Sequence, residues 1–554
     1  MYVLKRWIGR KADIELAQQI AQTYQLHPLV ARIVAARGYD VASTQAFLSP
    51  SRAQLHDPLL IHDMHKSVAR IQDAIVHKET VMIFGDYDVD GVSSVAILVK
   101  ALRKLGLDPL WRVPDRFCEG YGIRPQAVID AKEQGVHLIV TVDNGIAALE
   151  AADLARASGI DLIVTDHHHI GDQLPHAYAL VHPALGDYPF PELCGAGVAF
   201  KLAQALLGVF PEELLELVAL ATIADQVPLI GENRILVKEG LHRINLSPSV
   251  GIDALADVAN SKQGVTSTHV AFQLAPRINA IGRLAHAKRA VELLLADDPQ
   301  EAQRVALEAN GLNQKRQAIQ ERIYLSALAQ IEEHAWTDQT LVVAGESWHE
   351  GVIGIVAGKL TQNLYKPTLC LSIKDGVAKG SGRSVPGVDL YALLQAVQTK
   401  TGVLTAFGGH AAATGFSLPA DRIDDLRIAF ATVAQDVRVD AHIDADAPLH
   451  LHELTQPFIA DLKRLEPFGQ ANPEPIFFLR DVHIGDVQTM GAQQQHLRAR
   501  VKEGTGRGYS LVAFGEGGRV AEWLERTKRH LLVNVEENRY RDMVQIQMRL
   551  VEAK

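Results

Sequence analysis

The sequence has 554 residues, of which 47% are hydrophobic, so it can form several domains, each with a core of its own. No run of about 18 uninterrupted apolar residues occurs, and the first residues lack the pattern of a signal peptide, so we expect neither a membrane span nor a secretion signal. The net charge of −10 opposes nucleic-acid binding by the chain as a whole, although a whole-chain sum hides local basic patches. The three cysteines lie far apart in sequence, which fits a reducing cytoplasm and argues against structural zinc.

Residues 1–75 are expected to form an arm of helices and connecting loops. An amphipathic helix that contains Leu16 and Ile20 is expected to stop at His27-Pro28. A short helix over 42–48 is expected to stop before Pro50. We find no residue with evident chemistry in this arm.

Residues 81–91, V-M-I-F-G-D-Y-D-V-D-G, carry the first chemical signal. Four apolar residues predict a buried strand, and an apolar helix pattern begins after Gly91, so Asp86, Asp88 and Asp90 are expected in the intervening loop. Three carboxylates this close repel one another unless a cation lies between them. Mg²⁺ and Mn²⁺ prefer such ligands, although a solvated acidic turn or a calcium loop would have the same pattern.

The same arrangement recurs further along the chain. The strand-like run 138–142 is followed by Asp143, and the run 162–165 is followed by Asp166, His167 and His168. Each of these residues alone is also a common cap or turn former. Because the carboxyl ends of parallel strands meet at one edge of a sheet, the joint pattern predicts a metal site on an α/β fold.

Residues 214–335 are expected to be mainly helical. An apolar helix over 214–223 ends near Asp225, a carboxylate that needs a partner if it is buried. Residues 275–283 suggest a polar loop in which Arg277, Asn279 and Arg283 face a nucleic acid; an internal salt bridge is the alternative for Arg277. With Asp298 as N-cap, a long helix is expected from Pro299 to about Glu333, as a spacer between two domains across a cleft.

Two further domains are expected after this helix. In residues 336–435, glycine-rich turns beside Ser381, Arg383 and His410 predict an anion pocket in a second α/β domain. Residues 440–554 are rich in strand patterns, which favours an OB-like β-barrel. From Gly491 to Lys554 there are 12 Lys/Arg against 8 Asp/Glu, and three aromatic residues are candidates for stacking on bases or for the core: Phe514, Trp523 and Tyr540.

The motifs D-Y-D-V-D-G, V-D-N-G and T-D-H-H, in this order, resemble the DHH phosphoesterase superfamily and, within it, the RecJ family of single-strand-specific 5′→3′ exonucleases. The stretches P-R-I-N-A-x-G-R, G-S-x-R-S, G-G-H and P-F-G-x-x-N-P-x-P extend the resemblance over nearly all of the chain. It implies a DHH parallel-sheet catalytic domain (76–230), a helical region with the spacer helix (231–335), a DHHA1 domain (336–435) and an OB-like nucleic-acid-binding domain (440–554).

The resemblance also implies roles for individual residues and two divalent ions, Mn²⁺ or Mg²⁺. Asp143 is implied as the ligand that bridges the ions, with His168 as the residue that contacts the phosphate or assists proton transfer. Substrate-phosphate contacts and metal ligands follow from the same motifs. The phosphate contacts are Arg116, Ser381, Arg383 and His410, and the metal ligands are Asp86, Asp88, Asp90, Asp143, His167 and Asp225.

The function that follows is 5′→3′ exonuclease activity on single-stranded DNA in recombination and repair. A pocket for the 5′-phosphate would set the direction, and a narrow cleft would exclude duplex. We expect a cytoplasmic monomer whose candidate partners are a helicase and a single-strand-binding protein. Three alternatives are a DHH enzyme for small substrates, a non-catalytic DNA-binding relative and an acidic interaction protein; the spacer helix and barrel disfavour the first, and the ordered acidic ligands disfavour the other two.

Overall fold

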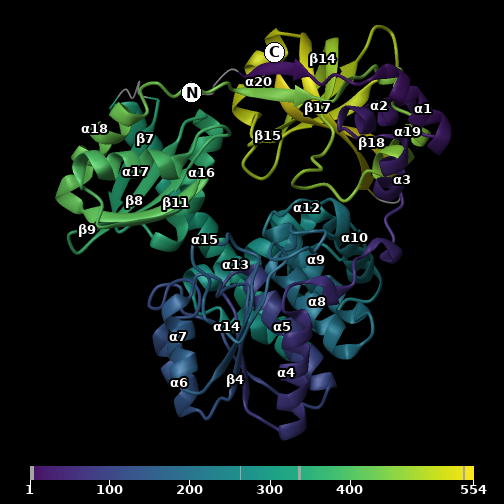
Figure 1. Ribbon diagram of the computed structural model, residues 1–554. Coiled ribbons are helices and arrows are strands. Elements are labelled where there is room, and N and C mark those ends of the chain that lie inside the picture. The colour runs from purple at the N-terminus through teal and green to yellow at the C-terminus, as the bar shows by residue number, and fades with distance from the viewer. Residues whose placement is uncertain (1–4, 263, 335–338, 541–542) are drawn as a thin grey trace.

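The computed structural model describes residues 5–262, 264–334, 339–540 and 543–554. Figure 1 shows an α/β body with its helical extension below, a second α/β body at the left and a barrel at the upper right. None of the helices in these described ranges has the length and apolar character that crossing a membrane requires.

The first sheet has five parallel strands in the order β3 (Leu110–Arg112), β2 (Val81–Phe84), β4 (Leu138–Val142), β5 (Asp161–Thr165) and β6 (Ala179–Val181). Its central strands are apolar throughout because helices cover both faces. One face packs on α4 (Met64–His77), α5 (Val89–Lys104) and α8 (Gly195–Leu207), and α9 (Leu215–Ala224) packs on α5 and α8. The other face packs on α6 (Pro125–Glu133) and α7 (Leu149–Ala157). The prediction of a parallel α/β sheet is confirmed.

Helices follow the first sheet in sequence, and the last of them joins two cores. They are α10 (Gly231–Leu246), α11 (Val250–Val258), α12 (Ser267–His269), the π-helical turn η4 (Val270–Leu274), α13 (Ala275–Leu284), α14 (Lys288–Leu295) and α15 (Pro299–Glu333). The bounds predicted for α15 are correct. Its first half buries Val305 in the core of the first body, and its second half buries Ile323 against the second. The polar loop predicted over 275–283 is wrong: Pro276 lies in the first turn of α13, where proline is tolerated, and Ile278 and Ile281 face the core.

The second sheet has the order β10 (Ala406–His410), β11 (Ala413–Pro419), β9 (Val377–Arg383), β8 (Thr368–Lys374) and β7 (Leu341–Glu346), in which only β7 and β8 are parallel. It packs with α16 (Glu350–Leu364), α17 (Leu390–Thr401) and α18 (Ile423–Val433). The glycine-rich stretches predicted as turns lie within β9 and β10. Gly380 has a structural reason to be in a strand, because a Cβ there would lie 2.1 Å from the ring of Phe416.

The C-terminal part is a closed barrel, as predicted. Its strands are β14 (Phe477–Met490), β15 (His496–Lys502), β16 (Tyr509–Ala513), β18 (Met543–Ala553) and β17 (Lys528–Tyr540), and β14–β17 pairing closes the ring. Of the three aromatic candidates, Trp523 is fully buried in α20 (Val520–Glu525), Phe514 is exposed, and the side chain of Tyr540 lies outside the described residues.

The N-terminal arm ties the barrel to the first body. Strand β1 (Arg6–Gly9), which was not predicted, pairs with β12 (His442–Ala445), and α1 (Ile14–Tyr24), α2 (Pro28–Ala36) and α3 (Val41–Leu48) pack into the barrel core beside β13 (Ala447–Pro448) and α19 (Gln456–Lys463). At this joint, the buried Arg234 of α10 donates hydrogen bonds to the carbonyl oxygens of Phe47, Leu465 and Glu466. Because one guanidinium is shared by three segments, it holds the barrel in a fixed position.

Candidate metal centre and phosphate pocket

The three aspartates of the first motif lie at the carboxyl end of β2. Asp88 is the N-cap of α5, and its carboxylate accepts the N–H groups of Asp90 and Gly91. Helix α5 therefore begins at Val89, and Asp90 lies in its first turn instead of the loop that the sequence analysis predicted. The backbone turns tightly here, since a Cβ on Gly91 would lie 2.6 Å from the Asp86 nitrogen.

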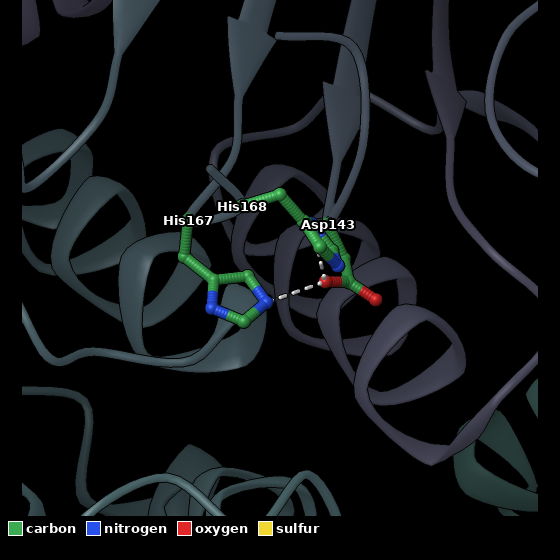
Figure 2. Close-up of side chains that lie close together, drawn as sticks. All are labelled: Asp143, His167 and His168. Carbon is green, nitrogen blue, oxygen red and sulfur yellow. Dashed lines mark hydrogen bonds and ion pairs between the residues drawn. The ribbon is translucent and has the colours of Figure 1, made fainter. Parts of the chain in front are cut away.

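Asp143 lies at the centre of the site, directly after β4. Its φ of 61° puts it in the left-handed region, a strained conformation that is common at functional sites. Its Oδ1 lies 3.1 Å from Nε2 of His167 and 3.9 Å from Nδ1 of His168, two residues that follow β5 (Figure 2). The parallel topology thus brings these residues together, as the strand-end pattern indicates.

The metal-ligand atoms form groups that share members. One group is Asp90, His167 and Asp225, and another is Asp86, Asp88 and Asp143; within each group the ligand atoms lie within 4.8 Å of one another. Asp143 also groups with His167 and His168, so it connects the two sets. All six residues assigned as metal ligands from the sequence thus lie at one edge of the sheet.

The electrostatics of this cluster fit divalent cations. Burial, and then the charges of neighbouring aspartates, raise the pKa of Asp86 and of Asp143 well above the usual value, and they raise the pKa of Asp225 to about 8. Burial lowers the pKa of His167, which favours the neutral imidazole that binds metal. Oδ1 of Asp86 is buried without a hydrogen-bond partner. Buried acids and an unpaired oxygen are the features that a bound cation would satisfy.

Helix α8 supports the cluster through its backbone. Gly195 and Ala196 each donate an N–H group to the Asp90 carboxylate, at 2.7 Å. A Cβ on Gly195 would lie 2.5 Å from the Cβ of Asp143, so only glycine fits. The glycine-rich stretch at 194–199 thus holds a ligand aspartate through its backbone.

Asp166 and Tyr121 belong to the site, although neither was assigned a role from the sequence. Asp166 accepts N–H groups from Ile146 and His167, and its Oδ1 lies 2.7 Å from Nδ1 of His168. The Tyr121 hydroxyl donates to the Asp143 carbonyl and lies 3.0 Å from Nδ1 of His168. The D-H-H motif contained Asp166, but only the fold reveals that it orients His168.

A group of arginines faces the metal centre from the junction of the two α/β bodies. Arg116 and Ser381 line one pocket of about 510 Å³, although they belong to different bodies. Burial, and then the charges of Arg116, Arg316 and Arg383, lower the pKa of Arg283 to about 10. Arg383 donates to Ser381 Oγ at 3.2 Å, and a Cβ on Gly354 would lie 2.8 Å from that same oxygen. Cations held this close attract an anion such as phosphate.

The remaining residues assigned from the sequence lie near these sites but have different surroundings. The ring of His410 is exposed and lies 6.3 Å from the ring of His169, across the junction of the two bodies. Asn279 accepts the N–H of Val89, which ties α13 to the metal loop. Arg277 of α13 donates to Oδ1 of Asn310 on α15 and to the carbonyl oxygens of Gln273 and Val258. Its guanidinium therefore joins α13 to neighbouring elements through neutral acceptors, and these hydrogen bonds are not a salt bridge.

The fold and the site define a DHH-type phosphoesterase, and the comparisons with known proteins agree. Residues 80–222 match the DHH family, N-terminal domain; residues 338–436 match the DHHA1 domain; residues 445–552 match the RecJ OB domain.

Curated relatives carry the name single-stranded-DNA-specific exonuclease RecJ. The Escherichia coli protein is 37% identical over 86% of this chain and 87% of its own length. The Bacillus subtilis protein is 38% identical over 92% of this chain. The matched region spans 66% of the length of that protein. The crystal structure of RecJ in complex with Mn²⁺ from Thermus thermophilus superposes with a TM-score of 0.85 at 29% identity, covering 99% of this chain and 79% of that one. The chain belongs to the RecJ family.

Replacing Gly195 with alanine tests the support of the cluster. The new Cβ would collide with Asp143, so Gly195→Ala should weaken Mn²⁺ binding by about tenfold or more in calorimetry while the far-UV circular dichroism stays unchanged. The control is Gly518→Ala, because no atom lies within 4 Å of a Cβ there. Unchanged Mn²⁺ affinity in Gly195→Ala would contradict this role.

The raised pKa values predict that metal binding releases protons. Because the pKa of Asp225 is about 8, its carboxyl is largely protonated in the metal-free protein at neutral pH. Mn²⁺ affinity should therefore increase from pH 6 to pH 9, and titrations at pH 7 in buffers of different ionisation enthalpy should reveal proton release. Without metal, the raised pKa should lower the free energy of unfolding as pH rises from about 4 towards 8. Mn²⁺ binding at pH 7 without proton release would refute the prediction.

Proposed function

We propose that this chain is a metal-dependent exonuclease that hydrolyses phosphodiester bonds of single-stranded DNA from the 5′ end, in DNA recombination and repair. The observation that carries the proposal is the convergence of five aspartates and two histidines at one sheet edge, opposite a group of arginines. Members of the family with this fold are named single-stranded-DNA-specific exonucleases.

Two divalent ions, Mn²⁺ or Mg²⁺, would be held by the two ligand groups. Asp86, Asp88 and Asp143 would hold one ion, while Asp90, His167 and Asp225 would hold the other; Asp143 lies between the groups and suits a bridging role. When bound, such ions stabilise charge on the phosphate and activate a water molecule.

His168 is suited to act on the phosphate as a hydrogen-bond or proton donor. Burial alone would lower the pKa of His168, but the hydrogen bond to Asp166 and the surrounding carboxylates raise it to about 9. In the protein without metal the ring is therefore protonated at neutral pH, and Asp166 and Tyr121 fix its orientation. A protonated imidazole can donate to a non-bridging oxygen of the scissile phosphate or to the leaving oxygen.

The arginines at the junction would bind the terminal 5′-phosphate. Arg116, Arg283 and Arg383 interact electrostatically within a small region, and Ser381 adds a hydroxyl group. His410 lies at the rim of the same junction. Anchoring the end of the strand here would place an internal phosphate at the metal centre, which sets the 5′→3′ direction. A DHH enzyme for small substrates would need neither the barrel nor the long helix.

The wider assignments complete the proposal. We divide the chain into an N-terminal arm (1–75), a catalytic domain (76–230), a helical region (231–335), a phosphate-binding domain (336–435) and a nucleic-acid-binding barrel (440–554). A cytoplasmic monomer that works with a helicase and a single-strand-binding protein is the form in which we expect it to act.

Asp143→Asn tests the catalytic assignment. Loss of the charge that lies between the two ligand groups should reduce degradation of 5′-labelled single-stranded DNA by on the order of a thousandfold, while DNA binding persists. The assay compares single- and double-stranded DNA blocked at either end, with Mn²⁺, Mg²⁺ or chelator. Asp172→Asn is the matched control, since Asp172 is an exposed aspartate in the loop after β5, the strand that pairs with β4. Activity in chelator, or full activity in Asp143→Asn, would disprove the metal mechanism.

Arg383→Ala tests the 5′-phosphate pocket. Removing one charged donor should raise KM about tenfold or more for 5′-phosphorylated single strands and change it little for strands with a 5′-hydroxyl. Arg438→Ala, which removes an exposed arginine after α18, should behave as the unsubstituted protein. An equal effect on both substrates would show that Arg383 does not read the terminal phosphate.

A further inference from the structure

We propose that Phe272 is a base-stacking residue that binds a nucleobase of the single strand beside the metal centre. The inference rests on the proposed function and adds a residue that determines how the strand is held. Phe272 lies in the π-helical turn η4 and is 75% exposed, against 59% for Phe514 on the barrel.

The turn η4 exposes Phe272 because its two ends are buried. Val270 and Leu274, two residues to either side, are fully buried and anchor the turn in the core. The Ala275 N–H donates to the Val270 carbonyl, the wider spacing of a π-helix. Such π-helical turns are rare in proteins, and many of those that occur lie at functional sites. A single exposed phenylalanine is ordinary on a protein surface, so support for a binding role comes from the residues around it.

Those surroundings are a pocket of about 500 Å³ whose lining includes neighbours of the metal centre. Phe272 lines it together with Ala224, the residue before Asp225, and with Asn279, whose side chain accepts the N–H of Val89 in the metal loop. Residues of the segment 468–474, which precedes the barrel strand β14, also line this pocket. A strand that reaches the metal centre from the barrel side would pass through this pocket.

The chemistry of the pocket suits a nucleotide. Its polar walls offer neutral donors and acceptors, among them Gln226, Ser267 and Gln362, while its one lining carboxylate, Glu474, is paired with Arg549. A flat apolar ring among neutral polar groups can stack on any base without reading its sequence. This property matches an enzyme that must degrade every sequence, and a duplex, whose bases are already paired and stacked, gains nothing from it.

An abasic scan tests the proposal on the full chain. Single-stranded, 5′-phosphorylated oligonucleotides would each carry one abasic site at a successive position, and kcat and KM would be measured for the unsubstituted protein and for Phe272→Ala. We expect one position near the cleaved bond at which the abasic site raises KM roughly tenfold for the unsubstituted protein. Phe272→Ala should raise KM by a similar factor on intact DNA, with kcat nearly unchanged and no further effect of the abasic site at that position.

Controls separate stacking from other roles. Phe272→Trp should restore the KM, and Leu246→Ala, at an exposed apolar residue of α10, should leave it unchanged. Mn²⁺ affinity should be the same in all variants. Unchanged KM in Phe272→Ala, or an abasic profile equal to that of the unsubstituted protein, would overturn the proposal. Failure of the unsubstituted protein to degrade any single strand would instead overturn the proposed function.

Discussion

Mutual repulsion among buried carboxylates is the constraint on which this structure depends. Asp86, Asp88, Asp90, Asp143 and Asp225 lie at one edge of the first sheet; Asp86, Asp90 and Asp143 are buried, and Asp88 and Asp225 are half-buried. Such a cluster is costly without positive charge: burial, and then the charges of neighbouring aspartates, raise the pKa values of Asp86, Asp88, Asp143 and Asp225. The fold supplies part of the compensation through backbone N–H groups at the starts of α5 and α8. Divalent cations would supply the rest.

The second constraint is the distance between the arginines and the carboxylates of the metal site. The arginines that would bind phosphate must lie close to the carboxylates without neutralising them, and here they belong mostly to other elements. Arg283 lies on α13, Arg316 on α15 and Arg383 on β9, while Arg116 follows β3. Helix α15 packs into both cores, so it fixes how far apart the two α/β bodies lie. An anionic strand between the two groups of charge would be attracted by both, through metal ions on one side and guanidinium groups on the other.

Much of the fold follows from patterns in the sequence, and the misses have physical reasons. Strand runs followed by acids predict the parallel sheet and gather five of the six ligand residues, because topology alone brings strand ends together. The sixth, Asp225, follows helix α9 and was assigned from the family resemblance. The start of α5 was missed because an aspartate before a helix is equally a loop residue or an N-cap, and Asp88 is the cap. The support of Asp90 by Gly195 joins residues about a hundred positions apart, and no local pattern contains it. Helix α13 was mistaken for a loop because Pro276 and Gly282 outweighed its apolar period; Gly282 is needed because a Cβ there would lie 2.4 Å from the Tyr87 carbonyl oxygen.

The most direct test of the central claim is anomalous diffraction from crystals of this protein grown with Mn²⁺. The account predicts two manganese peaks: one bound by Asp86, Asp88 and Asp143, and the other by Asp90, His167 and Asp225. Peaks at other places on the molecule, or carboxylates that remain without manganese at saturating concentration, would contradict it.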